Sequence, residues 1–204
     1  MVARALVYFI VFWSGYFVMA LELLGGRALS PYFGSGIYVW GAIITLFMLS
    51  LSIGYLLGGT WSSRSPTPVR LSSFLFLSAL TALPSVLFSN SILEFVFSQV
   101  PDPRYGALVA SILLFFVPIT VSGTVSPYAI RLLVEALGET GKVAGKVFFV
   151  STLGSTFGTL LTSFYLVLLF DLDQILMGML LISGALSVIG LLFFTRRARN
   201  VAIA

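Results

Sequence analysis

Residues 5–24, ALVYFIVFWSGYFVMALELL, form one apolar stretch, as long as the about 20 helical residues that a bilayer crossing needs. Similar stretches recur along the 204-residue chain, which is 59% hydrophobic and 9% charged. A soluble domain has about 25% charged residues. We therefore predict an all-α integral membrane protein, folded as a single six-helix domain over residues 1–204, with spans at 5–24, 39–59, 71–88, 105–124, 146–169 and 175–194.

Two segments depart from this simple pattern. Pro84 and the polar residues after it shorten the third span, so we predict a short interfacial helix at 91–100. At the N-terminus, Arg4 precedes an apolar run, as in a signal peptide. The run is too long for a signal peptide and has no small-residue cleavage site, so we expect a retained first span.

The basic residues lie in short segments between the apolar stretches, which favours contact with the membrane surface and not with nucleic acid. Under the positive-inside rule, their distribution predicts a plasma-membrane protein with both termini in the cytoplasm. Nine basic residues fall on that side and two, Arg27 and Arg104, on the other; the nine are Arg4, Arg64, Arg70, Arg131, Lys142, Lys146, Arg196, Arg197 and Arg199.

The chain has no cysteine and no histidine, so thiolate chemistry, imidazole catalysis and the usual zinc or haem ligands are excluded. The sequence also lacks a phosphate-binding glycine loop between strand and helix, a pair of acids and a nucleophile with its base. We therefore expect no cofactor, no bound metal and no enzyme activity.

Glu22 and Arg27 are charged residues at the edge of the first span. A charge at membrane depth costs about 2.5 kcal/mol or more, so it is usually kept where it faces a cavity, a partner or a substrate. One interpretation is a buried ion pair or a cation-binding carboxylate facing the bundle interior; the other is an interfacial Glu and Arg that anchor the helix end. If the helix continues through Gly25 and Gly26, the two side chains are about 140° apart around its axis, whereas a break would let them meet.

Glycines four residues apart mark the second and fifth spans, at Gly54 and Gly58 and at Gly154 and Gly158. Small residues on one helix face permit close packing in lipid, so we predict that these two spans build the close-packed interior. Ser155 and Thr159 belong to a hydroxyl-rich side of the fifth span. Such hydroxyls either bond to their own helix or line a polar pathway, and we name both residues as candidate solute ligands.

The fourth span ends in a segment with two prolines, Pro118 and Pro127, which cannot sustain a regular helix. We interpret it as the cytoplasmic end of the span, and the alternative is an interrupted helix at a binding site. Residues 130–137 are then predicted to form an amphipathic cytoplasmic helix.

Two segments of similar sequence suggest an internal repeat. Residues 26–32, GRALSPY, resemble residues 123–128, GTVSPY, at an offset of about 97, and the two glycine pairs are offset by 100. A 3+3 repeat of this kind is inverted in the membrane, as within each half of a major facilitator transporter. A chance match in a chain of biased composition is the alternative.

Residues 22–40, ELLGGRALSPYFGSGIYVW, together with GYLLGG at 54–59, resemble the transmembrane part of membrane-integrated spermidine synthase-like proteins. GKVAGK at 141–146 and STLGS at 151–155 resemble a later span of that family. The resemblance covers nearly the whole chain and implies a bundle similar to half of a major facilitator transporter. The chain departs from the family in ending at Ala204 without an aminopropyltransferase-like domain and in lacking an acidic residue in the loop 60–70.

These patterns leave two hypotheses for the function. The first is a transporter-like bundle that works as a homodimer and handles a small polar or cationic solute related to polyamines, with Glu22, Arg27, Ser155 and Thr159 as ligands. The second is a non-catalytic membrane anchor or scaffold for a soluble aminopropyltransferase-like partner. In both cases the lipid bilayer is a partner.

Overall fold

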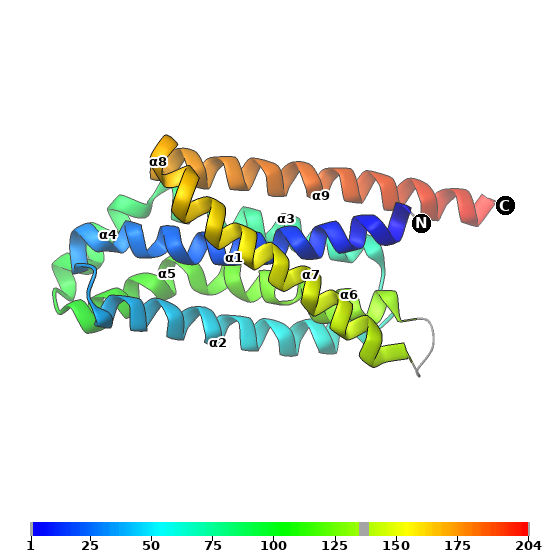
Figure 1. The fold of residues 1–204 in the computed structure, drawn as a ribbon, viewed down its shortest axis with the longest axis horizontal. Coiled ribbons are helices and arrows are strands. Elements are labelled where there is room, and N and C mark those ends of the chain that lie inside the picture. The colour runs from blue at the N-terminus through cyan, green and yellow to red at the C-terminus, as the bar shows by residue number, and fades with distance from the viewer. Residues whose placement is uncertain (1, 135–138, 204) are drawn as a thin grey trace.

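The computed structural model describes residues 2–134 and 139–203, with side chains described to residue 196. Within these residues the chain forms an all-α bundle of long helices lying side by side (Figure 1). Six helical segments are long and apolar enough to cross a membrane, which confirms the predicted fold class. The N- and C-terminal ends lie at the same end of the bundle (Figure 1).

The helices follow the predicted spans closely, with longer first and last members. In chain order they are α1 (Val2–Phe33), α2 (Ile37–Ser62), α3 (Pro68–Leu87), α4 (Ser89–Gln99), α5 (Pro103–Gly123), α6 (Val125–Leu133), α7 (Thr140–Leu161), a π-helical turn η2 (Thr162–Leu166), α8 (Val167–Leu169) and α9 (Leu172–Ile203).

Local sequence signals set several of these boundaries. α1 ends at Gly34, whose φ of 82° lies in the left-handed region that glycine adopts without strain. α3 and α5 each begin with a proline after a capping side chain: Thr67 accepts a hydrogen bond from the backbone N–H of Arg70, and Asp102 from that of Arg104. The predicted interfacial helix is present as α4, at the end of the bundle away from the termini (Figure 1).

The segment between Pro118 and Pro127 differs from its predicted form. The helix is interrupted only at Thr124 and resumes at once as α6, so both helices belong to one candidate span, Pro103–Leu133. Tyr128 and Ala129 are fully buried, and the hydroxyl of Tyr128 accepts a hydrogen bond from the backbone N–H of Thr67 in the loop between α2 and α3. The segment therefore forms the last turns of the span, at the end of the bundle that holds the termini, but as continued helix and not as a break. A separate helix at 130–137 was a wrong prediction: α6 ends at Leu133, and residues 135–138 lie outside the described part of the chain.

Each helix has one main packing partner. α1 packs chiefly on α7, α2 on α5 and α3 on α9, while α1 and α5 also contact each other. The interior is therefore centred on α1 and the α5–α6 span, which are the most buried segments; α7 is the least buried.

Glycines allow the closest of these contacts. On α7, a Cβ added to Gly154 would lie 3.1 Å from Phe12 Cα, and one added to Gly158 would lie 2.9 Å from Tyr16 Cα. On α2, a Cβ added to Gly58 would lie 2.7 Å from Thr124 Cα. The glycines do serve close packing, but the predicted partners were wrong: α2 and α7 pack on α5–α6 and on α1, not on each other.

The contacts of these glycines reveal an internal repeat. Gly154 and Gly158 of α7 meet the backbone of Phe12 and Tyr16, whereas Gly54 and Gly58 of α2 meet that of Thr120 and Thr124. Residue n of α2 thus corresponds to n+100 of α7, as predicted, and residue n of α1 to n+108 of α5–α6.

Gly15 and Gly123 obey the same rule, since they approach Ser151 and Leu51 respectively. The offset of 97 predicted from the Ser-Pro-Tyr match is therefore wrong for α1 and α5. Because α1 and α5 run in opposite directions, as do α2 and α7, the two three-span halves are inverted relative to each other (Figure 1).

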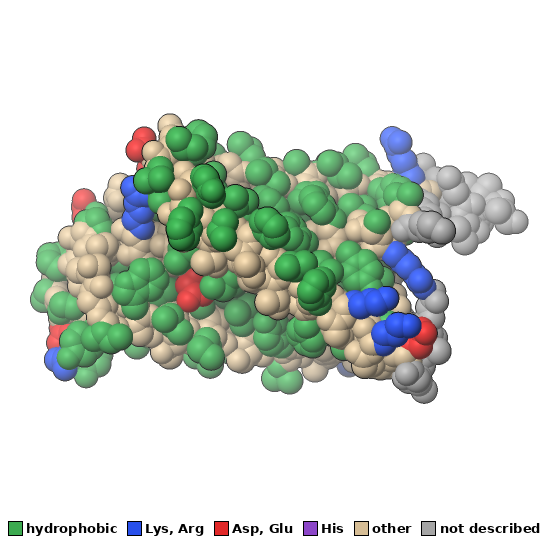
Figure 2. Space-filling view, viewed as in Figure 1, with side chains coloured by type: hydrophobic (Ala, Val, Ile, Leu, Met, Phe, Trp, Pro, Cys, Tyr) green, Lys and Arg blue, Asp and Glu red, His purple; other side chains and the backbone are tan. Residues whose placement is uncertain are grey.

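Charge divides the two ends of the bundle. Figure 2 shows Lys and Arg side chains gathered at the end that holds the termini, and acidic side chains mostly at the other end. At that other end Arg104 pairs with Asp102 at 3.0 Å and lies over the ring of Tyr38, with 5.8 Å from its guanidinium carbon to the ring centroid. Arg197 and Arg199 lie outside the residues whose side chains are described.

Candidate functional site

The two glycines after Glu22 do not break the first helix. α1 continues through Gly25 and Gly26 to Phe33. Both glycines are packing positions, because a Cβ on Gly25 would lie 2.9 Å from the ring of Phe115 on α5, and one on Gly26 would lie 2.6 Å from the ring of Trp40 on α2.

Glu22 and Arg27 consequently lie on different faces of α1, about 140° apart. The exposed Arg27 donates a hydrogen bond from Nη1 to the carbonyl oxygen of Val167, 3.3 Å away on α8. Glu22 is half-buried, and within the described residues no hydrogen bond or ion pair reaches its carboxylate. The structure therefore separates the two charges that the sequence placed in one site.

Glu22 lies deeper than its predicted place at the end of a span. It comes eleven residues before Phe33, a distance of about 16 Å along the helix. Phe33 in turn packs against Gly106, close to the Asp102–Arg104 pair that marks the charged edge of the bundle. The carboxylate is thus level with the apolar part of the spans, where lipid offers it no hydrogen bonds.

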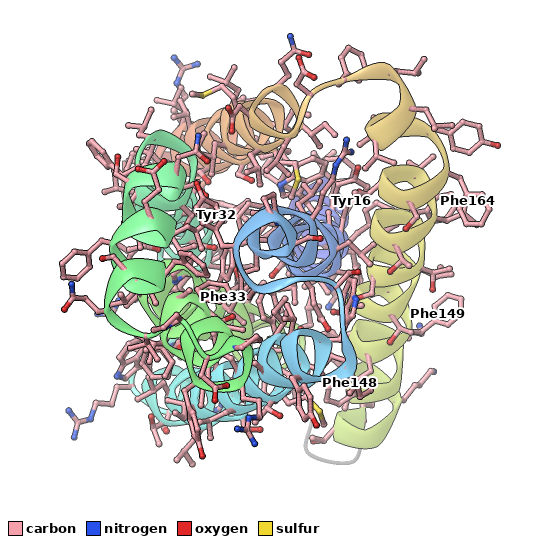
Figure 3. All side chains as sticks on the ribbon, turned by 90° about the vertical axis from the view of Figure 1, so that its left-hand side faces the viewer. Tyr16, Tyr32, Phe33, Phe148, Phe149 and Phe164 are labelled. Carbon is pink, nitrogen blue, oxygen red and sulfur yellow. The ribbon has the colours of Figure 1, made fainter. Side chains whose placement is uncertain are left out.

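The face of α1 that carries Glu22 lies between α2 and α7. Gly26, one helical turn after Glu22, contacts Trp40 of α2; Gly15, two turns before it, contacts Ser151 of α7. α2 and α7 do not pack together, so they leave this strip of α1 between them. Seen from the end of the bundle, α7 stands at the edge with Phe149 and Phe164 pointing away from α1 (Figure 3). We call this strip of the α1 surface the Glu22 face.

Ser155 and Thr159 occupy the α1-facing side of α7. The Ser155 hydroxyl donates to the carbonyl oxygen of Gly15 at 3.3 Å, so it ties the two helices together. Thr159, half-buried and one turn further along, is closer to the level of Glu22. Ser163 comes one turn later and donates to the carbonyl oxygen of Thr159 at 2.7 Å. Of the predicted ligands, Thr159 is the one that the helix register places toward Glu22.

Two features of the region were missed from the sequence. The end of α7 widens into the π-helical turn Thr162–Leu166, a rare form that often occurs at functional sites. Sequence periodicity gives no signal for it, because one extra residue in a turn leaves the apolar composition unchanged. An apolar cavity between α1, α7 and α9 also went unpredicted, since its lining residues come from three distant segments.

At the terminal end of the bundle a polar cavity of about 210 Å³ lies between α1, α6 and α7. Three basic side chains and one acidic side chain line it: Arg4, Lys142, Lys146 and Glu139. This places basic groups predicted to face the cytoplasm around one hollow.

Within the described residues no group of three His, Cys, Asp or Glu side chains is arranged to hold a metal ion. No family model, curated protein or solved structure matches the chain. The Glu22 face is therefore the candidate functional site of the protein.

Proposed function

We propose that this membrane protein binds a small organic cation at the Glu22 face and moves it across the membrane, with two copies of the chain forming the working unit. The observation that carries the proposal is the half-buried Glu22 carboxylate, which has no ionic or hydrogen-bonding partner among the described residues. A charge at this depth requires compensation, and a cationic solute supplies it.

The surroundings of Glu22 suit such a ligand. The Glu22 face is bordered by the apolar ring of Trp40 on the α2 side and by hydroxyls on the α7 side, where Thr159 and Ser163 come toward the level of the carboxylate. A polyamine or a similar amine combines a charge for the carboxylate, N–H donors for hydroxyl oxygens and methylene groups for the apolar wall. The resemblance to spermidine synthase-like membrane proteins favours the same class of solute.

The inverted repeat supports a transport role. Transporter folds are commonly built from inverted three-span repeats, with the solute site near the middle of the membrane at a repeat interface. One six-helix bundle supplies half of such a device, and a second copy related by a two-fold axis supplies the other. We propose that the protein lies in the plasma membrane with both termini on the cytoplasmic side, because the basic side chains gather at the end of the bundle that holds the termini.

Uptake of labelled spermidine into proteoliposomes tests the proposal. We expect Glu22→Gln to reduce uptake by at least about tenfold, the effect of losing about 1.4 kcal/mol of binding. Asp173→Asn is the matched control, because this acid lies in the exposed first turn of α9. Both variants should purify and melt like the wild type.

Equal spermidine uptake by wild type and Glu22→Gln rules out the Glu22 face as the transport site. Cross-linking in native membranes checks the dimer separately: the proposal requires a cross-linked species of twice the chain mass, formed by wild type and Glu22→Gln alike. If the protein transports spermidine as a monomer, the proposed dimer is wrong and the proposed transport site is unaffected.

The basic cavity at the terminal end favours a second candidate, the membrane anchor. Arg4, Lys142 and Lys146 form a positive surface that an acidic face of a soluble aminopropyltransferase-like protein would contact. The charge-reversal pair Lys142→Glu and Lys146→Glu should abolish co-purification of such a partner and leave spermidine uptake unchanged.

A further inference from the structure

An apolar cavity with a volume of about 500 Å³ lies between α1, α7 and α9. Its lining is rich in aromatic side chains and includes Trp13, Tyr16, Phe157, Phe170, Gly178 and Ile182. Glu22, Thr159 and Ser163 are not among its lining residues, so the cavity plays no part in the proposed transport site.

The cavity lies at membrane depth and follows the helix direction. Its α9 wall runs from Gln174 to Ile182, about 12 Å along the helix. Phe157 and Ile182 are each 47% exposed, so the cavity is open sideways toward lipid. What fills it therefore comes from the bilayer, and a hydrocarbon chain aligned with the membrane normal matches its length and its apolar lining.

One wall of the cavity is formed by a fixed indole ring and by a glycine without a side chain. Trp13 lines it with its indole held in place, because Nε1 donates to the hydroxyl of Ser183 at 2.7 Å. Gly178 contributes no side chain, and a Cβ there would meet no atom within 4 Å. The space beside Gly178 is therefore open, and a larger side chain at this position would extend into the cavity.

The guanidinium of Arg27 lies near one end of the cavity. Leu166 belongs to the lining, and Arg27 donates to the carbonyl oxygen of the next residue, Val167. That bond uses one of the five guanidinium N–H donors, and the others have no acceptor among the described residues. Gln174 also lines this end, where its Oε1 accepts from the backbone N–H of Asp171 at 3.1 Å, which leaves its amide N–H₂ to donate.

We propose that this cavity is a binding site for one phospholipid, with an acyl chain between α1, α7 and α9 and the phosphate on Arg27. The lipid belongs to the leaflet away from the termini. A guanidinium binds phosphate oxygens through paired N–H groups, and the Gln174 amide is placed to assist. An apolar helix of another chain would leave the free donors of Arg27 and Gln174 without an acceptor, whereas a phospholipid headgroup supplies phosphate oxygens.

Native mass spectrometry of the delipidated protein with dioleoylphosphatidylglycerol tests this site. Wild type should bind one lipid more tightly than any further ones. Gly178→Phe fills the cavity and should weaken that first site by at least about tenfold, because several buried methylene contacts are lost. Gly184→Phe is the matched control: Gly184 is also on α9 with no atom near its Cβ position, lies outside the cavity lining, and should leave binding unchanged.

The phosphate contact is tested with Arg27→Gln against Arg104→Gln. Loss of a charged hydrogen bond predicts about tenfold weaker binding for the first variant and no change for the second. Dioleoylglycerol, which has the same chains and no phosphate, should bind wild type and Arg27→Gln equally weakly.

Equal first-site affinity in Gly178→Phe and Gly184→Phe overturns the proposal, and so does equal binding of dioleoylglycerol and the phospholipid to wild type. Ile182→Trp fills the same cavity from its rim and replaces Gly178→Phe if that variant does not purify as a monodisperse protein. The proposal also fails if excess detergent displaces the first bound lipid from wild type as readily as it displaces the further ones.

Discussion

The hydroxyl of Ser14 donates a hydrogen bond to the carbonyl oxygen of Ser122, 3.3 Å away, where α1 meets α5. The two serines are also equivalent residues of the internal repeat, because the shift of 108 that relates Phe12 to Thr120 relates Ser14 to Ser122. Equivalent residues touch only at the axis that relates the two halves. The bond therefore marks the pseudo-two-fold axis of the bundle, and it lies in a buried polar seam.

The first prediction concerns that seam. Ser78 of α3 reaches the hydroxyl of Ser122 at 2.5 Å, and all three serines are buried. Hydrogen bonds between membrane helices contribute about 0.6 kcal/mol on average and up to about 1.7 kcal/mol. We expect a coupling energy in this range from the cycle of Ser78→Ala, Ser122→Ala and the double variant, measured by denaturation in mixed micelles. Additive effects of the two single variants would contradict the bond.

The second prediction concerns the α1–α7 contact. A Cβ at Gly158 would meet the backbone of Tyr16, which cannot move aside as a side chain does. Gly158→Leu should destabilise the protein by more than the about 1–3 kcal/mol typical of overpacking, or prevent folding. Gly184→Leu is the control, since its Cβ position is open. Similar melting temperatures for the two variants in detergent would show that the contact is not close.

The third prediction rests on the repeat. Gly54 and Gly154 meet the backbone of equivalent residues, Thr120 and Phe12, so Gly54→Ala and Gly154→Ala should destabilise to a similar degree. Gly59 has open space at its Cβ position, and Gly59→Ala should be neutral or stabilising by several tenths of a kcal/mol, because alanine favours helix more than glycine. A large difference between the first two variants would argue against equivalent packing in the two halves.

The spans were predictable from the sequence because each carries its own signal: about 20 apolar residues bounded by charge, proline or glycine. The helix partners were not. Gly54 and Gly154 predict a close helix contact, but a small residue does not predict which helix backbone approaches it. The three-residue match of Ser30 to Tyr32 with Ser126 to Tyr128 misled the repeat alignment, because helix contacts and not local identity define equivalent residues.

The candidate site was likewise predictable from the sequence only in part. Glu22 stood out in the sequence because a charge within an apolar span is costly. Its separation from Arg27 depended on whether Gly25 and Gly26 break the helix, and packing against Phe115 and Trp40 decides that. The cavity lined by Trp13 and Gly178 could not be predicted from sequence patterns, since its lining residues come from three helices that are distant in the sequence.

The fourth prediction tests the orientation of the bundle. The chain has no cysteine, so single cysteines can be labelled without background. Gly36, before α2, and Pro66, before α3, lie at opposite ends of the bundle. With the termini in the cytoplasm, Gly36→Cys should react with an impermeant maleimide from outside the cell, and Pro66→Cys only after the membrane is opened. The reverse pattern would invert the topology.

The last prediction concerns Asp102, at the edge of the bundle opposite the termini. Its carboxylate accepts hydrogen bonds from the side chain of Arg104, at 3.2 Å from Nε and 3.0 Å from Nη2, and from the backbone N–H of Arg104 at 2.9 Å. These bonds favour the charged form and hold the pKa of Asp102 below its usual value of about 3.9.

Because the folded-state pKa is the lower one, Asp102 stabilises the fold above the unfolded pKa, and this contribution is lost as the pH falls through the folded pKa. A carbon-13 NMR titration of the Asp102 carboxyl should therefore give a midpoint below about 3.9, rising toward that value in Arg104→Gln. Arg27→Gln serves as the control, since Arg27 bonds to α8 and should leave the midpoint unchanged. An Asp102 midpoint that is the same with and without Arg104 would mean that the capping N–H alone sets it, and the Asp102–Arg104 pair would then have no part in holding the start of α5.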